Sequence, residues 1–142
     1  MKIDNFKVTP GNAYIIAEIG NNHNGSISLA MEMIDQAIEA GANCVKFQMR
    51  TLNEVYRKQS SDSSGEDLGT EYVVDLLKRF ELSKLEHKEL FEYCKKNNIT
   101  YLCTPWDAIS LEFLEELGVS AYKVASADLT NVPLIELSLI HI

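Results

Sequence analysis

The sequence is poor in cysteine, in positive charge and in long apolar runs. Three cysteines in 142 residues, an odd number without C-x-x-C spacing, indicate neither a disulfide framework nor a zinc site. Lysine and arginine number 13 against 21 aspartates and glutamates, and the net charge of -8 argues against nucleic acid and anionic membrane surfaces as partners. The first residues lack the apolar core of a signal peptide, and no apolar run is long enough to cross a membrane. Together these absences predict a cytoplasmic protein.

The segments that are present alternate between strand-like and helix-like patterns. Short apolar runs predict strands at 14–19, 43–48, 99–103 and 121–124. Apolar residues at helical spacing predict helices after Ser26 or Ser28, over 71–80, after Ser83 and after Asp107. Such an alternation is typical of α/β proteins with parallel strands and right-handed crossovers.

Local signals mark the ends of these helices. Ser83 and Glu86 form a capping box, and Gly41 and Gly118 are natural stops for the helices that precede them. Residues 50–70 form a polar stretch, with the run SSDSSG at its centre. We expect a long functional or mobile loop there, since long loops in compact domains are rarely incidental.

Each expected strand carries polar residues at its C-terminal end. Because the carboxyl ends of parallel strands form the active-site rim of α/β proteins, these residues are the candidate site. They are Glu18, then Lys46 and Gln48, then Thr104, then Lys123 and Ser126. Side chains two apart in a strand share a face, so Lys46 and Gln48 should point one way and Val45 and Phe47 the other.

Two inward lysines require negative charge nearby. One interpretation is a structural ion pair between Glu18 and one of the lysines. A second is that the lysines, with the hydroxyls of Thr104 and Ser126, bind a phosphate or carboxylate. A third makes one lysine a Schiff-base nucleophile. The cysteines are open to two interpretations as well, as small buried apolar residues or as a source of a catalytic thiol.

Several separate motifs resemble those of the sialic acid synthase family. The family comprises N-acetylneuraminate, legionaminate and pseudaminate synthases. The motifs are EIGNNHNG at 18–25, VKFQ at 45–48, Thr104 with Pro105, YKVAS at 122–126, and Asn131 followed by Pro133 and Leu134. They occur in the family's order and spacing over nearly the whole chain.

The resemblance implies a TIM (β/α)8 barrel that condenses phosphoenolpyruvate with an open-chain N-acetylated amino sugar such as N-acetylmannosamine. The products would be a sialic-type nonulosonic acid and phosphate, and a divalent Mn²⁺ or Mg²⁺ would polarise the sugar aldehyde. Glu18, Lys46, Lys123 and Asp128 would be the catalytic residues. The substrate-binding residues would divide the two substrates between them. Phosphoenolpyruvate would be held by Lys46, Lys123, Thr104 and Ser126, Gln48 would contact the sugar, and Asn22 and His23 would shape the floor of the pocket.

The chain also departs from the family pattern. A TIM barrel needs roughly 200 residues or more, so 142 residues should supply only the first four or so βα units. The family's metal-binding histidines, the second half of the barrel and the antifreeze-like domain have no counterpart here, so we expect no metal ligand in this chain. We expect the 142 residues alone to be inactive and the full-length parent to be a homodimer. The alternatives are another phosphoenolpyruvate-condensing barrel, acting on a phosphorylated sugar, and an inactive anion-binding half-barrel.

Overall fold

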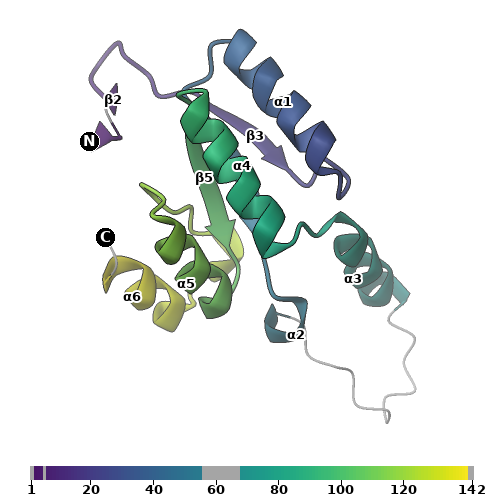
Figure 1. Ribbon diagram of the computed structural model, residues 1–142. Helices are drawn as coiled ribbons and strands as arrows, with labels where there is room; N and C mark the ends of the chain where they lie inside the picture. The colour runs from purple at the N-terminus through teal and green to yellow at the C-terminus, as the bar shows by residue number, and fades with distance from the viewer. Residues whose placement is uncertain (1, 5, 56–67, 141–142) are drawn as a thin grey trace.

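The centre of the molecule is a three-stranded parallel sheet. The computed structural model describes residues 2–4, 6–55 and 68–140. The sheet has the order β3-β4-β5, formed by β3 (Ile16–Gly20), β4 (Cys44–Met49) and β5 (Thr100–Pro105) (Figure 1). Two long crossovers join these strands, as expected for parallel pairing. Three of the four expected strands are therefore confirmed, with small shifts of their ends.

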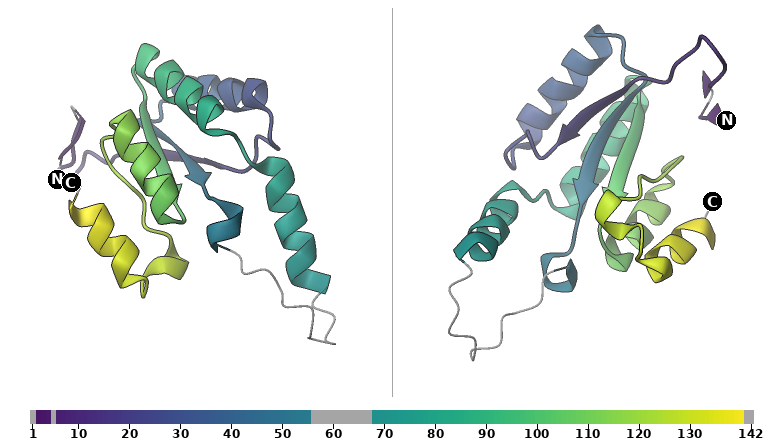
Figure 2. Two further views of the ribbon diagram at one scale, coloured as in Figure 1. Left: turned by 60° about the horizontal axis from the view of Figure 1, so that its bottom comes forward. Right: turned by 180° about the vertical axis from the view of Figure 1, so that it is seen from behind.

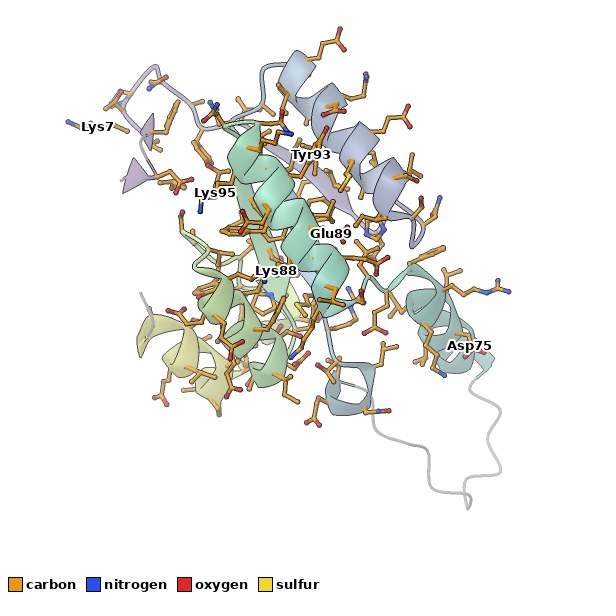
Figure 3. All side chains as sticks on the ribbon, viewed as in Figure 1. Lys7, Asp75, Lys88, Glu89, Tyr93 and Lys95 are labelled. Atoms are coloured by element: carbon orange, nitrogen blue, oxygen red, sulfur yellow. The ribbon has the colours of Figure 1, made fainter. Side chains whose placement is uncertain are left out.

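Three helices cover one face of this sheet. They are α1 (Ile27–Glu39), α4 (Lys84–Lys96) and α5 (Ala108–Leu117). The view from behind in Figure 2 shows the strands in front of these helices, with no described element over the opposite face. Tyr93 of α4 also donates a hydrogen bond to Asp35 of α1 at 2.8 Å, which joins the two neighbouring helices (Figure 3).

The remaining elements are short or peripheral. A two-stranded antiparallel hairpin of β1 (Lys2–Ile3) and β2 (Phe6–Lys7) precedes the sheet. The sequence pattern missed it, because two residues are too few to show a periodicity. After β4 come α2 (Leu52–Val55) and α3 (Leu68–Phe80), and after α5 come the 3₁₀ turn η1 (Ser126–Asp128) and α6 (Val132–Ile140). Among the described residues, no helix is both long and apolar enough to cross a bilayer.

The expected loop at 50–70 is wrong at both of its ends. Residues 52–55 form α2, and α3 already begins at Leu68 rather than at residue 71. The central part of that expectation, 56–67, lies outside the described residues. The sequence pattern missed α2 because four residues are too few to show an apolar periodicity.

The fourth expected strand, 121–124, is also wrong. The segment makes a single parallel bridge, between Tyr122 and Cys103, and the Lys123 amide donates to the Cys103 carbonyl at 3.1 Å. A strand requires consecutive bridges, and no described strand lies on the other side of this segment. The chain then turns into η1 after one bridge, although the apolar pattern of 121–124 resembles that of a strand.

The expected helix ends are confirmed. Ser26 caps α1 by accepting from the Leu29 amide at 3.3 Å, and both halves of the capping box between Ser83 and Glu86 are present at α4. Asp107 caps α5 by accepting from the Ser110 amide at 2.8 Å. Gly118 ends α5 at a φ of 76°, a left-handed conformation that glycine adopts without steric cost.

The hydrophobic core lies between the sheet and its helices. Phe47 of β4 is fully buried and stacks on Tyr101 of β5 at 5.4 Å between ring centroids. Ile34 of α1 and Leu90 of α4 are fully buried in the same cluster. On the other face of the sheet, Ile16 is still 39% exposed. The sheet therefore has one closed, apolar face and one open face.

Candidate active site

Strand register brings the predicted polar residues onto the open face. Glu18 of β3 is paired with Lys46 of β4, and Lys46 is paired with Leu102 of β5. Gln48 and Thr104 form the next pair towards the strand ends. Paired residues of neighbouring strands share a face. The alternation predicted for Lys46 and Gln48 against Val45 and Phe47 is therefore confirmed.

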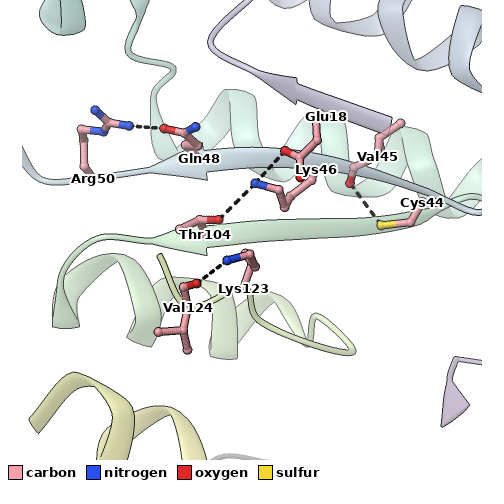
Figure 4. A network of polar contacts seen from close by, with 9 residues as sticks. All are labelled: Glu18, Cys44, Val45, Lys46, Gln48, Arg50, Thr104, Lys123 and Val124. Atoms are coloured by element: carbon pink, nitrogen blue, oxygen red, sulfur yellow. Dashed lines mark hydrogen bonds and ion pairs between the residues drawn. The ribbon is translucent and has the colours of Figure 1, made fainter. Parts of the chain in front are cut away.

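Lys46 is the centre of this polar row. Its Nζ lies 2.7 Å from Glu18 Oε2 and donates to Thr104 Oγ1 at 3.5 Å (Figure 4). The Lys46 side chain is 8% exposed, whereas that of Glu18 is 61% exposed. A largely exposed acid thus compensates the buried ammonium, as in the ion-pair interpretation above. The ammonium has three donors, and these two contacts account for two of them.

Lys123 lies on the neighbouring segment but outside this contact network. It is exposed, and its Nζ donates to the Val124 carbonyl at 2.5 Å (Figure 4). Ser126, also exposed, opens the η1 turn. Neither residue contacts Lys46 directly among the described interactions. The structure therefore brings together Glu18, Lys46 and Thr104, and leaves Lys123 and Ser126 at the adjoining edge.

Asp128 ends the η1 turn as a buried carboxylate. It is 9% exposed, and its Oδ1 accepts from Asn131 Nδ2 at 3.2 Å. Its Oδ2 is buried and has no hydrogen-bond partner among the described residues. Leaving such an oxygen unpaired costs roughly 1–3 kcal/mol. A buried acceptor without a partner suits a position that hydrogen-bonds to a ligand.

His23 is buried beside Phe47, away from the row of Glu18, Lys46 and Thr104, and its expected part in the ligand pocket stays a prediction. It is 2% exposed, and its ring lies 6.1 Å from that of Phe47, on the helix side of the sheet. Its Nδ1 accepts from the Gly25 amide at 3.1 Å, and burial lowers the pKa of the imidazole. The chain makes a turn between β3 and α1, in which Asn24 and Gly25 have positive φ. Asn22 in the same turn is exposed.

The sequence pattern missed Arg50. Its guanidinium donates to Gln48 Oε1 (Figure 4). The guanidinium also lies 4.9 Å from the centre of the Trp106 ring. Arg50 is the first residue of the polar stretch 50–70, so the strand-end pattern stops two residues before it, at Gln48. The alternation of side chains along a strand could have indicated Arg50, because residues 46, 48 and 50 follow the two-residue repeat and so share a face.

The cysteines behave as buried apolar residues. Cys44, Cys94 and Cys103 are each at most 1% exposed. Burial raises the pKa of each thiol to about 12. A thiolate is the nucleophilic form of cysteine, so these positions do not favour a catalytic thiol.

The residues of the site do not fit the divalent metal that the resemblance implies. Over residues 2–4, 6–55 and 68–140, no three His, Cys, Asp or Glu side chains gather in a cluster that could hold an ion. The acid of the polar row, Glu18, is already paired with Lys46. No chemical step is therefore assigned to a metal held by this chain.

The fold and the site define a class of protein: an α/β protein with a parallel sheet whose strand ends carry a row of charged and hydroxyl side chains. The chain belongs to the NeuB family, whose family model matches residues 33–139. The parallel α/β fold accordingly matches part of the barrel of this family, and the family suggested by the EIGNNHNG and VKFQ motifs is confirmed.

Individual relatives support the same assignment. The N,N'-diacetyllegionaminic acid synthase of Campylobacter jejuni is 37% identical over 122 residues, which are 84% of this chain and 36% of that protein. The N-acetylneuraminate-9-phosphate synthase of Mus musculus is 36% identical over 126 residues, or 87% of this chain and 35% of that protein. This chain therefore spans about a third of the length of these curated relatives.

A solved structure shows the same arrangement. The N-acetylneuraminic acid synthetase of Leptospira borgpetersenii, crystallised with citrate, superposes with a TM-score of 0.76 at 36% identity. The match covers 94% of this chain and 46% of that chain.

Proposed function

We propose that this chain forms the phosphoenolpyruvate-binding side of a synthase that condenses phosphoenolpyruvate with an N-acetylated amino sugar. The observation that carries the proposal is the row of Glu18, Lys46 and Thr104 across three strand ends. A buried ammonium beside a hydroxyl is a suitable receptor for a phosphate or carboxylate. The names of the relatives point to nonulosonic acids as the class of product.

Lys46 is proposed to bind the anionic groups of phosphoenolpyruvate. Because Lys46 is almost fully buried, its attraction to an anion is less screened than that of a surface lysine. Glu18 is largely exposed, so its pairing with Lys46 can rearrange when a ligand arrives. Lys123 and Ser126 are proposed to approach the same anion from the neighbouring segment, with Thr104 donating its hydroxyl.

The proposed reaction is a condensation followed by loss of phosphate. The C3 carbon of phosphoenolpyruvate forms a bond to the aldehyde carbon of the sugar, and the aldehyde oxygen takes up a proton. Water then adds at C2, and phosphate leaves as the C2–O bond breaks, which gives the 2-keto acid. Glu18 is proposed to move a proton or orient the attacking group, and Asp128 to act near the reacting carbon.

The identity of the partners is part of the proposal. N-Acetylmannosamine is the proposed sugar, a homodimer the proposed assembly and the cytoplasm the proposed location. Manganese or magnesium is the proposed metal, with ligands other than the residues described. A phosphorylated sugar is the second candidate, since the mouse relative is named for a 9-phosphate product.

The experiment is an assay of the natural protein that carries this sequence. Phosphate release from phosphoenolpyruvate would be measured with N-acetylmannosamine, with its 6-phosphate and without sugar, in the presence of manganese. We expect sugar-dependent release of phosphate and a nonulosonic acid by mass spectrometry. Tight binding of phosphoenolpyruvate without turnover of either sugar would instead support an inactive anion-binding protein. Release without sugar would contradict the condensation.

A further inference from the structure

Arg50 and Trp106 form a layer of side chains above the proposed site. The register pairs Gln48 with Thr104 and Met49 with Pro105, and the Trp106 amide donates to the Met49 carbonyl at 3.0 Å. The ladder thus continues one step beyond the strands. Arg50 and Trp106 follow Gln48 and Thr104 by two residues each, so they lie on the same side at the strand C-terminal ends. Figure 4 shows Arg50 and Gln48 extending from the same side of β4.

Arg50 is held in this place by several contacts. Its guanidinium lies over the Trp106 ring at 4.9 Å, within the range of a cation–π interaction. The next residue, Thr51, donates to Asp107 from its amide at 2.6 Å and from its hydroxyl at 3.1 Å. Asp107 is fixed in turn by the amide and hydroxyl of Ser110, both at 2.8 Å. The ends of β4 and β5 are therefore tied together beside the Arg50 side chain.

This arrangement determines which end of the Gln48 amide is available to a ligand. A guanidinium carries donors and no acceptor, so the Gln48 atom that faces Arg50 must be the carbonyl oxygen. The NH₂ group then points the other way. A Cβ built on Gly20 would lie 3.6 Å from Gln48 Nε2, which places the NH₂ towards the end of β3. Gln48 consequently presents donors, not an acceptor, across the open face.

We propose that Arg50 is a positioning residue that fixes Gln48 as a hydrogen-bond donor to the sugar substrate. The group of the sugar that meets Gln48 is then an acceptor oxygen, of a carbonyl or a hydroxyl. This inference rests on the proposed function, because it takes the sugar to bind beside Gln48. Without Arg50 the amide is free to rotate, and either end faces the ligand.

The first test replaces Arg50 by methionine in the natural protein. Loss of one oriented hydrogen bond should raise KM for the sugar about 5-fold, while KM for phosphoenolpyruvate changes less than about 2-fold. Arg50→Lys, which keeps a donor, should restore part of the loss. Lys7→Met is the matched control: it removes one positive charge from the exposed hairpin residue at the other end of the sheet (Figure 3).

The second test is Gln48→Glu, which keeps the shape and the contact with Arg50 but removes the NH₂ donors. It should raise KM for the sugar about 10-fold or more, because an acceptor would then face an acceptor. Normal sugar binding by Gln48→Glu, or an unchanged KM in Arg50→Met, would overturn the inference while the wild type remained an active synthase. A wild type that never condenses phosphoenolpyruvate with a sugar would instead overturn the proposed function.

Discussion

Each face of the central sheet buries a basic side chain, but the two side chains have different kinds of partner. On the open face Lys46, 7% exposed, is paired with the carboxylate of Glu18. On the closed face His87 of α4, 2% exposed, packs edge-on against Phe47, and its Nδ1 lies 2.7 Å from the Tyr101 hydroxyl. Burial lowers the pKa of His87 to about 4, so its imidazole is neutral at pH 7.

This difference shows which face of the sheet is suited to bind a charged ligand. On the closed face the imidazole of His87 is neutral, because ionisation in an apolar core is costly. The open face keeps charge, and its acid partner is largely exposed to solvent. An incoming anion can therefore take over the interaction with Lys46, whereas His87 and Tyr101 are both buried and hydrogen-bond to each other. The predictions below test this contrast, from the largest expected effect to the smallest.

Glu18→Gln should have the largest effect on activity and a smaller effect on stability. If Glu18 handles a proton, its replacement should lower kcat by about 10²–10⁴. Some stability should be lost, because Lys46 stays buried without its acid partner, but the glutamine carbonyl still offers an acceptor to the Lys46 ammonium. Steady-state kinetics and thermal melts of the natural protein measure both. A near-normal kcat together with a much lower Tm would show that Glu18 only serves to compensate Lys46.

Phe47→Ala should produce the opposite result. Phe47 is fully buried on the closed face, beside His23, His87 and Tyr101. Removal of a core phenylalanine ring costs about 3–5 kcal/mol of stability. We expect a large drop in Tm and in the denaturation midpoint. Phe47→Leu should recover most of it, and a loss of activity in Phe47→Leu at unchanged stability would contradict the separation of the two faces.

His87 should make the stability of the protein depend on pH. Its pKa in the folded state is about 4 against an ordinary 6.5, so between these values the unfolded chain binds a proton that the folded chain does not. The contribution is complete above pH 6.5 and is lost as pH falls towards 4. The total is about 3 kcal/mol.

The measurement compares the free energy of unfolding of the wild type and of His87→Gln from pH 7.5 to 4. Glutamine keeps a hydrogen bond to Tyr101 but does not titrate in this range. The difference between the two proteins should shrink as pH falls from 6.5. Parallel curves would mean that His87 is not buried as a neutral base.

Lys46→Met should weaken phosphoenolpyruvate binding without unfolding the protein. Loss of a charge-assisted contact costs about 1.5–3 kcal/mol, or roughly 10- to 100-fold in KM for phosphoenolpyruvate. Glu18 left behind is solvated, so its unpaired charge costs little. KM for both substrates would be measured, with Lys46→Arg as the variant that keeps the charge. An effect confined to the sugar would contradict the assignment.

Much of the fold could be predicted from local sequence signals. Strand alternation correctly separated Lys46 from Phe47, and the caps at Ser83, Asp107 and Gly118 act within one turn of the chain. Such features depend on neighbours in sequence, so the sequence is sufficient to predict them. The motifs around Glu18 and Lys46 were also sufficient to indicate the family that the NeuB match confirms.

The tertiary structure alone decided the features that depend on residues distant in sequence. His23 turned to the helix side because Phe47 and the packed helices offered it an apolar site. The segment around Tyr122 made one bridge because only β5 lies beside it among the described residues. Arg50 acquired its place through Trp106, 56 positions away in the chain, and through the contact of Thr51 with Asp107. Sequence patterns determine which way a side chain leaves its own strand, whereas packing determines what it meets there, since contacts between separate elements exist only after the chain has folded.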